Sequence, residues 1–121
     1  MNLSKKEYNQ EPLTHAQIDK IGNAMIFLSE KINPLYKTSA LKLLYLLEEI
    51  SIRRYGIPFF GVGFQLWRLG PVLPDIYIDL TESTVMLDKY ITKQTIGENT
   101  TVQAKLPFCD DEFSDCDMIV L

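Results

Sequence analysis

Residues Thr38–Tyr77, TSALKLLYLLEEISIRRYGIPFFGVGFQLWRLGPVLPDIY, decide the fold, because they hold the single tryptophan and the most apolar segment of the chain. Leu43–Leu47 is apolar nearly all round a helix, which is typical of a helix buried at the centre of a fold. We expect this helix to run from Thr38 or Ser39, both good N-caps, to about Tyr55, where a Gly-Ile-Pro sequence stops it.

The charged residues of this helix are expected to mark the face or the ends that reach water. These residues are Lys42, Glu48, Glu49, Arg53 and Arg54. Glu49 and Arg53 lie four residues apart, a spacing that favours an ion pair on a helix surface. The remaining face is expected to pack in the core of the protein.

A short aromatic segment, Phe64–Arg68, is flanked by glycines and predicts a strand, with a buried loop as the alternative. Gly70 and Pro71 are expected to break it. Pro74 and Asp75 suit the first turn of a further helix, because proline loses no intrahelical hydrogen bond there and an acidic residue complements the helix dipole. The inner face of that helix is expected to consist of Ile76, Tyr77 and Leu80.

An earlier helix is predicted from Thr14, which stands with Gln17 at the spacing of a capping box. Apolar residues recur along it at steps of three and four, which predicts one buried stripe. The helix should end near Asn33, because Pro34 biases its predecessor away from helical geometry. The stripe consists of Ile18, Ile21, Met25, Leu28 and Ile32.

The C-terminal part of the chain predicts a hairpin and a short helix. Thr81–Tyr90 is ambiguous, since its pattern is consistent with one or two more helical turns. Ile91–Leu106 includes alternating apolar and polar residues and a turn at Gly97–Asn99, the pattern of a small hairpin. Ser114 and Asp117 resemble a second capping pair, and the apolar residues after them predict a helix that the chain end cuts short.

Composition favours one compact globular domain. A chain of 121 residues with 46% hydrophobic and 23% charged residues supports a single core. We place the domain at 13–121, with its last helical part incomplete, after a polar leader at 1–12 that we expect to be flexible. The expected fold class is mainly α (α+β): a compact helical domain with a central buried helix and a small antiparallel β element.

Charge and hydropathy limit the partners. A net charge of −4 with a pI near 4.9 argues against a protein that mainly neutralises phosphates, and an acidic domain more naturally meets a basic protein. The apolar runs are shorter than the roughly 20 residues that span a bilayer, and Met1–Gln10 lacks the apolar segment of a signal peptide. The sequence therefore predicts a cytosolic protein without a membrane or nucleic-acid partner.

No catalytic, cofactor-binding or metal-binding set is evident in the sequence. The only histidine, His15, falls at the start of a helix, where we expect it to be exposed. Gly61 and Gly63 lack the further glycine and the lysine of a phosphate loop, so they are expected to be turn glycines. Cys109 and Cys116 are spaced neither as a redox pair nor as half of a zinc site, and we expect free thiols.

Two further clusters carry less specific signals. The acidic cluster near the C-terminus lacks the loop glycine and the distant glutamate of a calcium site, so we expect a solvated helix cap. The aromatic residues of the central stretch are expected mainly in the core, but partly exposed tryptophan dominates protein interfaces, and this singles out Trp67. The acidic cluster comprises Asp110, Asp111, Glu112, Asp115 and Asp117, and the aromatic group comprises Tyr45, Tyr55, Phe59, Phe60, Phe64, Trp67 and Tyr77.

Several motifs follow one another in order along the central stretch. They are a Lys-Leu-Leu-Tyr core in the helix, a Tyr-Gly-x-Pro-Phe turn, an aromatic strand ending in tryptophan, and a Gly-Pro-Val-x-Pro sequence followed by a tyrosine. The residues are Lys42, Leu43, Leu44, Tyr45, Tyr55, Gly56, Pro58, Phe59, Trp67, Gly70, Pro71, Val72, Pro74 and Tyr77. This pattern resembles the SocA-like antitoxin domain, also called Panacea.

The resemblance implies a mainly helical domain that acts as the antidote of a bacterial or phage toxin–antitoxin pair by binding the toxin. We therefore hypothesise a non-enzymatic protein that neutralises a cognate toxin encoded by an adjacent gene, without a cofactor. The alternatives are a DNA-binding transcriptional autoregulator or another protein-binding adaptor, and the formation of a homo-oligomer stays open. The predicted partner-binding residues are Trp67, Arg68, Gly70, Pro71, Pro74, Asp75 and Tyr77, with an acidic surface near Asp110–Asp117 as a second contact.

Overall fold

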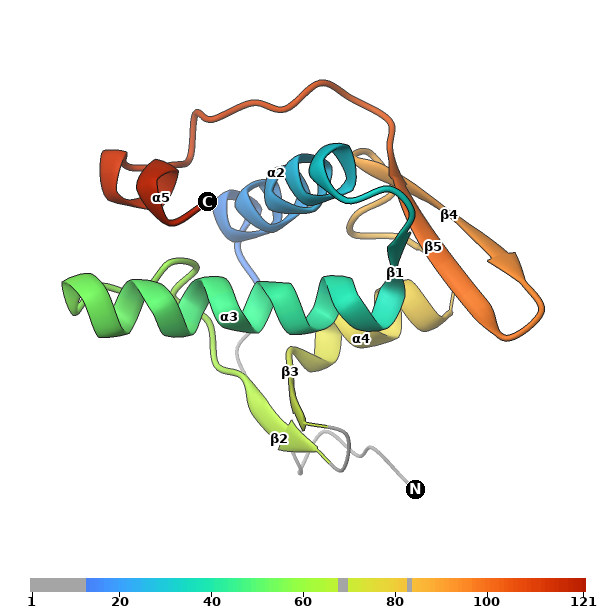
Figure 1. Cartoon of the computed structure of the whole chain (residues 1–121), viewed down its shortest axis with the longest axis horizontal. Coiled ribbons are helices and arrows are strands. Elements are labelled where there is room, and N and C mark those ends of the chain that lie inside the picture. The colour runs from blue at the N-terminus through green and yellow to red at the C-terminus, as the bar shows by residue number, and fades with distance from the viewer. Residues whose placement is uncertain (1–12, 68–69, 83) are drawn as a thin grey trace.

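The computed structural model describes residues 13–67, 70–82 and 84–121, and Figure 1 shows the course of the chain. Helices predominate in an α+β fold, as the sequence predicts. The elements in chain order are α2 (His15–Lys31), β1 (Leu35–Tyr36), α3 (Lys37–Tyr55), β2 (Gln65–Trp67), β3 (Gly70–Val72), α4 (Pro74–Thr81), β4 (Ile91–Ile96), β5 (Asn99–Ala104) and α5 (Asp115–Val120).

The capping box predicted for the first helix is present at the start of α2. The backbone N–H of Gln17 donates a hydrogen bond to Thr14 Oγ1 at 3.1 Å, and the backbone N–H of Thr14 donates one to Gln17 Oε1 at 2.9 Å. The helix ends at Lys31, with Ile32 as its C-cap, close to the predicted end at Asn33. Local side-chain chemistry therefore fixes the start of this helix.

The predicted N-caps of the second helix are wrong. α3 begins at Lys37 with Tyr36 as its N-cap, and Thr38 and Ser39 lie inside the first turn. The reason is the short strand β1, whose Leu35 pairs with Val102 of β5 and holds the chain extended up to the first helical residue. At the other end the prediction is confirmed, because α3 stops at a glycine with φ of +66°.

α3 is the central helix, since it lies between α2 and α4 and also contacts α5, β1, β3 and β5 (Figure 1). Only one of its faces is buried, through residues such as Ala40, Leu44 and Leu47. Leu46 and Ile50 on the outer face are 41% and 39% exposed. The apolar ring expected around Leu43–Leu47 is therefore buried on one side.

Glu48 does not reach water, in contrast to the sequence prediction. Its side chain is buried, and its two carboxylate oxygens accept hydrogen bonds from the Phe59 amide at 3.2 Å and the Phe60 amide at 2.9 Å. The turn after α3 brings these amides back to the helix, where a carboxylate satisfies donors that have no strand partner. The predicted surface pair is confirmed, with Glu49 Oε2 3.7 Å from an Arg53 guanidinium nitrogen.

Two antiparallel β elements are present. The predicted hairpin is confirmed as β4 and β5, which pair around a turn at Gly97, and β1 adds to the far side of β5 to give the order β1-β5-β4. The predicted strand at Phe64–Arg68 is confirmed as β2. Gly70 and Pro71, however, do not end the sheet, because they belong to β3 and pair with β2. The chain can turn back into β3 because Gly70 adopts a positive φ of +119°, which glycine tolerates.

The C-terminal helix α5 begins with the predicted capping box of Ser114 and Asp117. Asp117 is nevertheless not part of an acidic surface, because its side chain is buried against α2. Its Oδ2 lies 2.6 Å from Lys20 Nζ, with side-chain exposures of 7% and 14%. Lys20 also donates to the carbonyl of Phe59 and lies 4.6 Å from the centroid of its ring, so one ammonium joins α2, α5 and the segment after α3.

The aromatic residues divide between the core and its edge. Phe59 and Phe60 are buried, as predicted, and their rings meet edge to face at 4.7 Å. Tyr45 and Phe64 are half-buried and pack edge to face at 5.5 Å. The largest fully buried side chains are Phe59, Ile21, Met25, Ile26, Leu35, Leu44, Leu73, Ile76, Leu80, Leu87, Ile91 and Val102.

A close approach between α2 and Tyr90 predicts that Gly22→Ala destabilises the fold. A Cβ at Gly22 would lie 2.5 Å from Cγ of the Tyr90 ring, and that ring is held by a hydrogen bond to Asp19. Overpacking costs about 1–3 kcal/mol, which we expect to outweigh the gain of about 1 kcal/mol in helix propensity. The urea midpoint of unfolding should fall.

The matched control is the same substitution in a Tyr90→Ala background, where the ring is absent. There Gly22→Ala should be neutral or stabilising, because only the helix propensity remains. An equal loss in both backgrounds would contradict the contact.

Tyr90 also predicts how stability changes at alkaline pH. Burial, then the hydrogen bond to Asp19 and the charge of that carboxylate, raise the pKa of Tyr90 from 10.0 to about 12. A group whose pKa is raised in the folded state contributes stability that is complete below its unfolded pKa and is lost as the pH rises through its folded pKa. The free energy of unfolding should therefore fall between about pH 10 and 12.

Urea titrations from pH 8 to 11.5 measure this slope in the wild type and in Tyr90→Phe. The slope should be shallower in Tyr90→Phe, because the hydroxyl whose pKa is raised is then absent. Identical slopes for the wild type and Tyr90→Phe would exclude Tyr90 as the cause.

Candidate functional site

The residues predicted to bind a partner lie in the β2–β3 hairpin and at the start of α4. The hairpin extends away from the helical body, on the opposite side of α3 from α2 (Figure 1). Trp67 ends β2, where its backbone pairs with Gly70 of β3, while Arg68 lies outside the described residues. Pro71 follows in β3 and is half-buried.

α4 turns its predicted residues in different directions. Pro74 occupies the first helical position, where proline starts a helix without losing an intrahelical hydrogen bond, and it is buried. Asp75 and Tyr77 are half-buried and, two residues apart on a helix, they lie on opposite sides of α4. Asp75 lines one surface pocket, and a second pocket lies near the Tyr77 side, where Lys37 of its lining reaches Tyr77.

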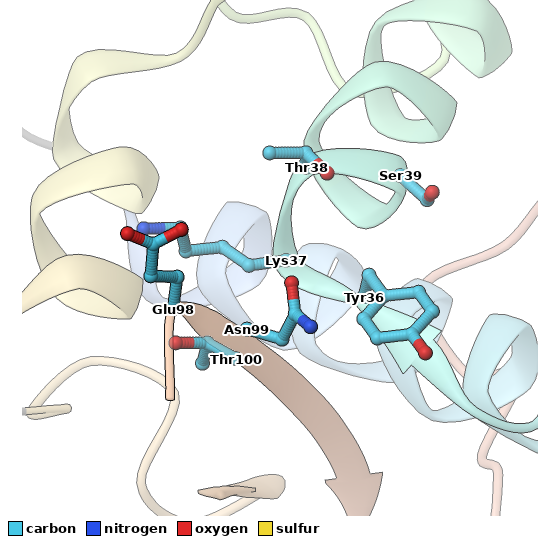
Figure 2. A pocket seen from close by; sticks show the side chains of 7 residues that line it. All are labelled: Tyr36, Lys37, Thr38, Ser39, Glu98, Asn99 and Thr100. Atoms are coloured by element: carbon cyan, nitrogen blue, oxygen red, sulfur yellow. The ribbon is translucent and has the colours of Figure 1, made fainter. Parts of the chain in front are cut away.

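The pocket on the Tyr77 side lies between the start of α3 and the turn of the β4–β5 hairpin, and it has a volume of about 260 Å³ (Figure 2). Lys37 extends across it toward α4, where its Nζ donates to Thr81 Oγ1 at 3.3 Å and lies 5.5 Å from the Tyr77 ring centroid. A lysine and a glutamate both line the pocket, so it does not select a ligand of either charge. Its lining residues are Tyr36, Lys37, Thr38, Ser39, Glu98, Asn99 and Thr100.

The pocket on the Asp75 side has a volume of about 390 Å³ and differs in chemistry. Its walls are apolar, and every charged residue that lines it is acidic. Val85, one of the lining residues, is 75% exposed, the highest value among the exposed large hydrophobic residues of the described chain. The lining residues of this acidic pocket are Asp75, Ile78, Asp79, Glu82, Val85 and Met86.

Asp79 has a structural role in the acidic pocket. It is buried, and its carboxylate accepts hydrogen bonds from the amides of Val85 at 2.8 Å, Met86 at 2.9 Å and Leu87 at 3.1 Å. The Thr84 hydroxyl donates to its backbone carbonyl at 3.2 Å. The segment after α4 is therefore held against the helix by one side chain, which places Val85 and Met86 at the pocket.

Asp75 is different, because its carboxylate forms no hydrogen bond or ion pair with another described residue. Burial raises the pKa of Asp75 above its usual value. Glu82 is exposed, and in the part of the chain that the structure describes it forms no ion pair. Lys93 donates to the backbone carbonyls of Leu80, at 3.0 Å, and Glu82, which satisfies the end of α4 rather than either carboxylate.

The remaining candidates from the sequence do not assemble into a site. His15 is exposed at the start of α2, as expected, and Cys109 is an exposed free thiol. Across residues 13–67, 70–82 and 84–121 no three histidine, cysteine or acidic side chains are grouped to hold a metal ion. No helix in those ranges has the length and hydropathy needed to cross a membrane.

The described residues thus form a small, helix-rich α+β domain with an acidic, apolar-walled pocket on one side of α4. The family model of the antitoxin SocA-like, Panacea domain matches residues 41–121, from the fifth residue of α3 to the last residue of the sequence. The chain belongs to this family. No curated protein and no solved structure gives a significant match to it.

The contrast between the two aspartates of α4 predicts opposite effects on stability. Asp79→Asn should destabilise by about 1–3 kcal/mol, because an amide nitrogen replaces an acceptor of buried N–H groups. Asp75→Asn should leave the urea midpoint unchanged or raise it, because the raised pKa of Asp75 means that the folded state disfavours its charge at pH 7. Urea denaturation of both variants at pH 7 measures this, and equal losses would contradict the assignment.

Proposed function

We propose that this protein is a non-enzymatic antitoxin that binds and neutralises a partner toxin of a bacterial or phage toxin–antitoxin system. The observation that carries the proposal is the family match over residues 41–121, which includes α3, the β2–β3 hairpin, α4 and the C-terminal elements. The net charge of −4 supports a basic protein as the partner. The cytoplasm is the compartment in which we expect this to happen.

The surface that we propose for the contact is the β2–β3 hairpin together with the half-buried residues Asp75 and Tyr77 of α4. Three observations support this choice: the hairpin extends from the body, α4 carries a half-buried carboxylate without a donor, and a pocket lies beside it (Figure 1). Pro74 contributes by starting α4. The proposed contact residues are Trp67, Arg68, Gly70, Pro71, Asp75 and Tyr77.

The proposed mechanism is steric. β3 contacts α3, and Asp79 fixes α4 to the segment that follows it, so the described part of this surface is anchored to the fold before it meets a partner. A preorganised surface loses little conformational entropy on binding. Covering the active or target-binding face of a toxin then requires no chemistry from the antitoxin.

Co-expression with the products of adjacent genes tests the proposal. One neighbour should stop growth when expressed alone, allow growth together with this protein, and co-purify with it. Trp67→Ala should weaken the complex about tenfold or more, as expected for a tryptophan at the centre of an interface, and should reduce the rescue of growth.

Ile96→Ala is the matched control, because it truncates an apolar side chain that is 67% exposed on the β4–β5 hairpin. It should leave rescue and affinity unchanged, and circular dichroism should show that both variants are folded. If no adjacent product is toxic, the antitoxin proposal fails. If the protein instead retards its own promoter DNA at moderate salt, the autoregulator takes its place.

A further inference from the structure

The acidic pocket beside α4 offers two kinds of surface to one ligand. Its walls are the apolar side chains of Ile78, Val85 and Met86, and Val85 is mostly exposed. Its volume of about 390 Å³ lies within the range of about 300–1,000 Å³ that ligand pockets occupy. An aliphatic chain would therefore remove exposed apolar surface from water.

The charge in the same pocket has one sign. Asp79 is already satisfied by three amides, which leaves the carboxylates of Asp75 and Glu82 to face a ligand. No lysine or arginine among the described residues lines the pocket, and the Lys93 ammonium donates to the backbone carbonyls of Leu80 and Glu82. Within the described part of the chain these two carboxylates therefore have no cationic partner.

Asp75 carries an energetic cost that a cation would remove. Its carboxylate is partly withdrawn from water without receiving a hydrogen bond in return, and burial alone raises its pKa. Partly buried carboxylates are normally compensated by a donor or an ion pair. A neutral donor bound beside it would supply hydrogen bonds alone, whereas a cationic donor would supply hydrogen bonds and also oppose the charges of Asp75 and Glu82.

We propose that this pocket binds one arginine or lysine side chain of the partner protein, with its aliphatic part against Ile78, Val85 and Met86 and its charge between Asp75 and Glu82. Long basic side chains combine an apolar stem with a charged end, and so match both surfaces of the pocket. The identity of the partner rests on the proposed function, but the chemistry of the pocket does not.

The direct test uses a small probe rather than the toxin. We would titrate the full chain, labelled in its methyl groups, with the peptide acetyl-Leu-Arg-Leu-amide and with the same peptide containing citrulline, which has nearly the same shape but no charge. The arginine peptide should shift the methyl resonances of Ile78, Val85 and Met86, with a Kd on the order of 1 mM. The citrulline peptide should bind at least about tenfold more weakly.

Substitutions then separate the two surfaces. Asp75→Asn and Glu82→Gln should each weaken binding of the arginine peptide, and Val85→Ser should weaken binding of both peptides. Glu30→Gln, which removes one exposed negative charge at the end of α2, is the charge-matched control and should leave binding unchanged. Equal affinities for the two peptides, or shifts that map elsewhere, would overturn the proposal.

The toxin experiment distinguishes this inference from the proposed function. If wild type and Asp75→Asn neutralise a neighbouring toxin equally well, the antitoxin function stands and the pocket is not its contact. If no neighbour is toxic but the arginine peptide binds as expected, the pocket is a site for basic side chains and the antitoxin function fails. Loss of neutralisation in Asp75→Asn, with Glu30→Gln unaffected, supports both.

Discussion

The backbone of Phe59 and Phe60 is held between the buried carboxylate of Glu48 and the partly buried ammonium of Lys20, and the placement of α2, α3 and α5 depends on it. Glu48 of α3 accepts hydrogen bonds from the Phe59 and Phe60 amides. Lys20 of α2 donates a hydrogen bond to the Phe59 carbonyl and forms an ion pair with Asp117 of α5. A buried charge costs several kcal/mol when it lacks partners, so each of these three charges requires the others' elements to be in place. Because β2 follows directly after this segment, the course of the β2–β3 hairpin and of α4 is set here as well.

The same principle organises the rest of the molecule and makes Asp75 stand out. The Asp79 carboxylate accepts hydrogen bonds from three backbone amides. The Asn23 side chain accepts a hydrogen bond from the Cys109 amide at 2.8 Å and donates one to the Asp19 carbonyl at 2.9 Å. Among the described residues no fully buried side-chain nitrogen or oxygen lacks a partner. In the described part of the chain Asp75 departs from this pattern, because it is a half-buried carboxylate that forms no hydrogen bond and lies beside the exposed side chain of Val85. This departure costs stability, and it is the reason why we propose a binding role for this side of α4.

The sequence predicted those features that local chemistry determines. Capping boxes, the Gly56 stop, the first position of α4 and the turn of the β4–β5 hairpin all depend on residues a few positions apart. It failed where a residue's surroundings come from distant segments. Glu48 and Asp117 were expected in water because their partners, Phe59 and Lys20, are brought to them only by the tertiary fold, and the start of α3 was misplaced because β1 pairs with β5.

In α4, too, some features of the candidate site could be predicted from local sequence, whereas others depend on the tertiary fold. The resemblance drew attention to Asp75, but nothing in the local sequence indicated that a pocket lies beside it. The opposite wall consists of Val85 and Met86, from a segment whose pattern was ambiguous, and it stands where it does because Asp79 accepts the amides of both residues. Asp79 of α4 therefore positions one wall of the pocket and stabilises the fold. Asp75, four residues earlier, gives the pocket negative charge and lowers the stability of the fold. The two acidic residues of this short helix therefore differ in their surroundings: Asp79 is buried and accepts three hydrogen bonds, whereas Asp75 is half-buried and accepts none from the described residues.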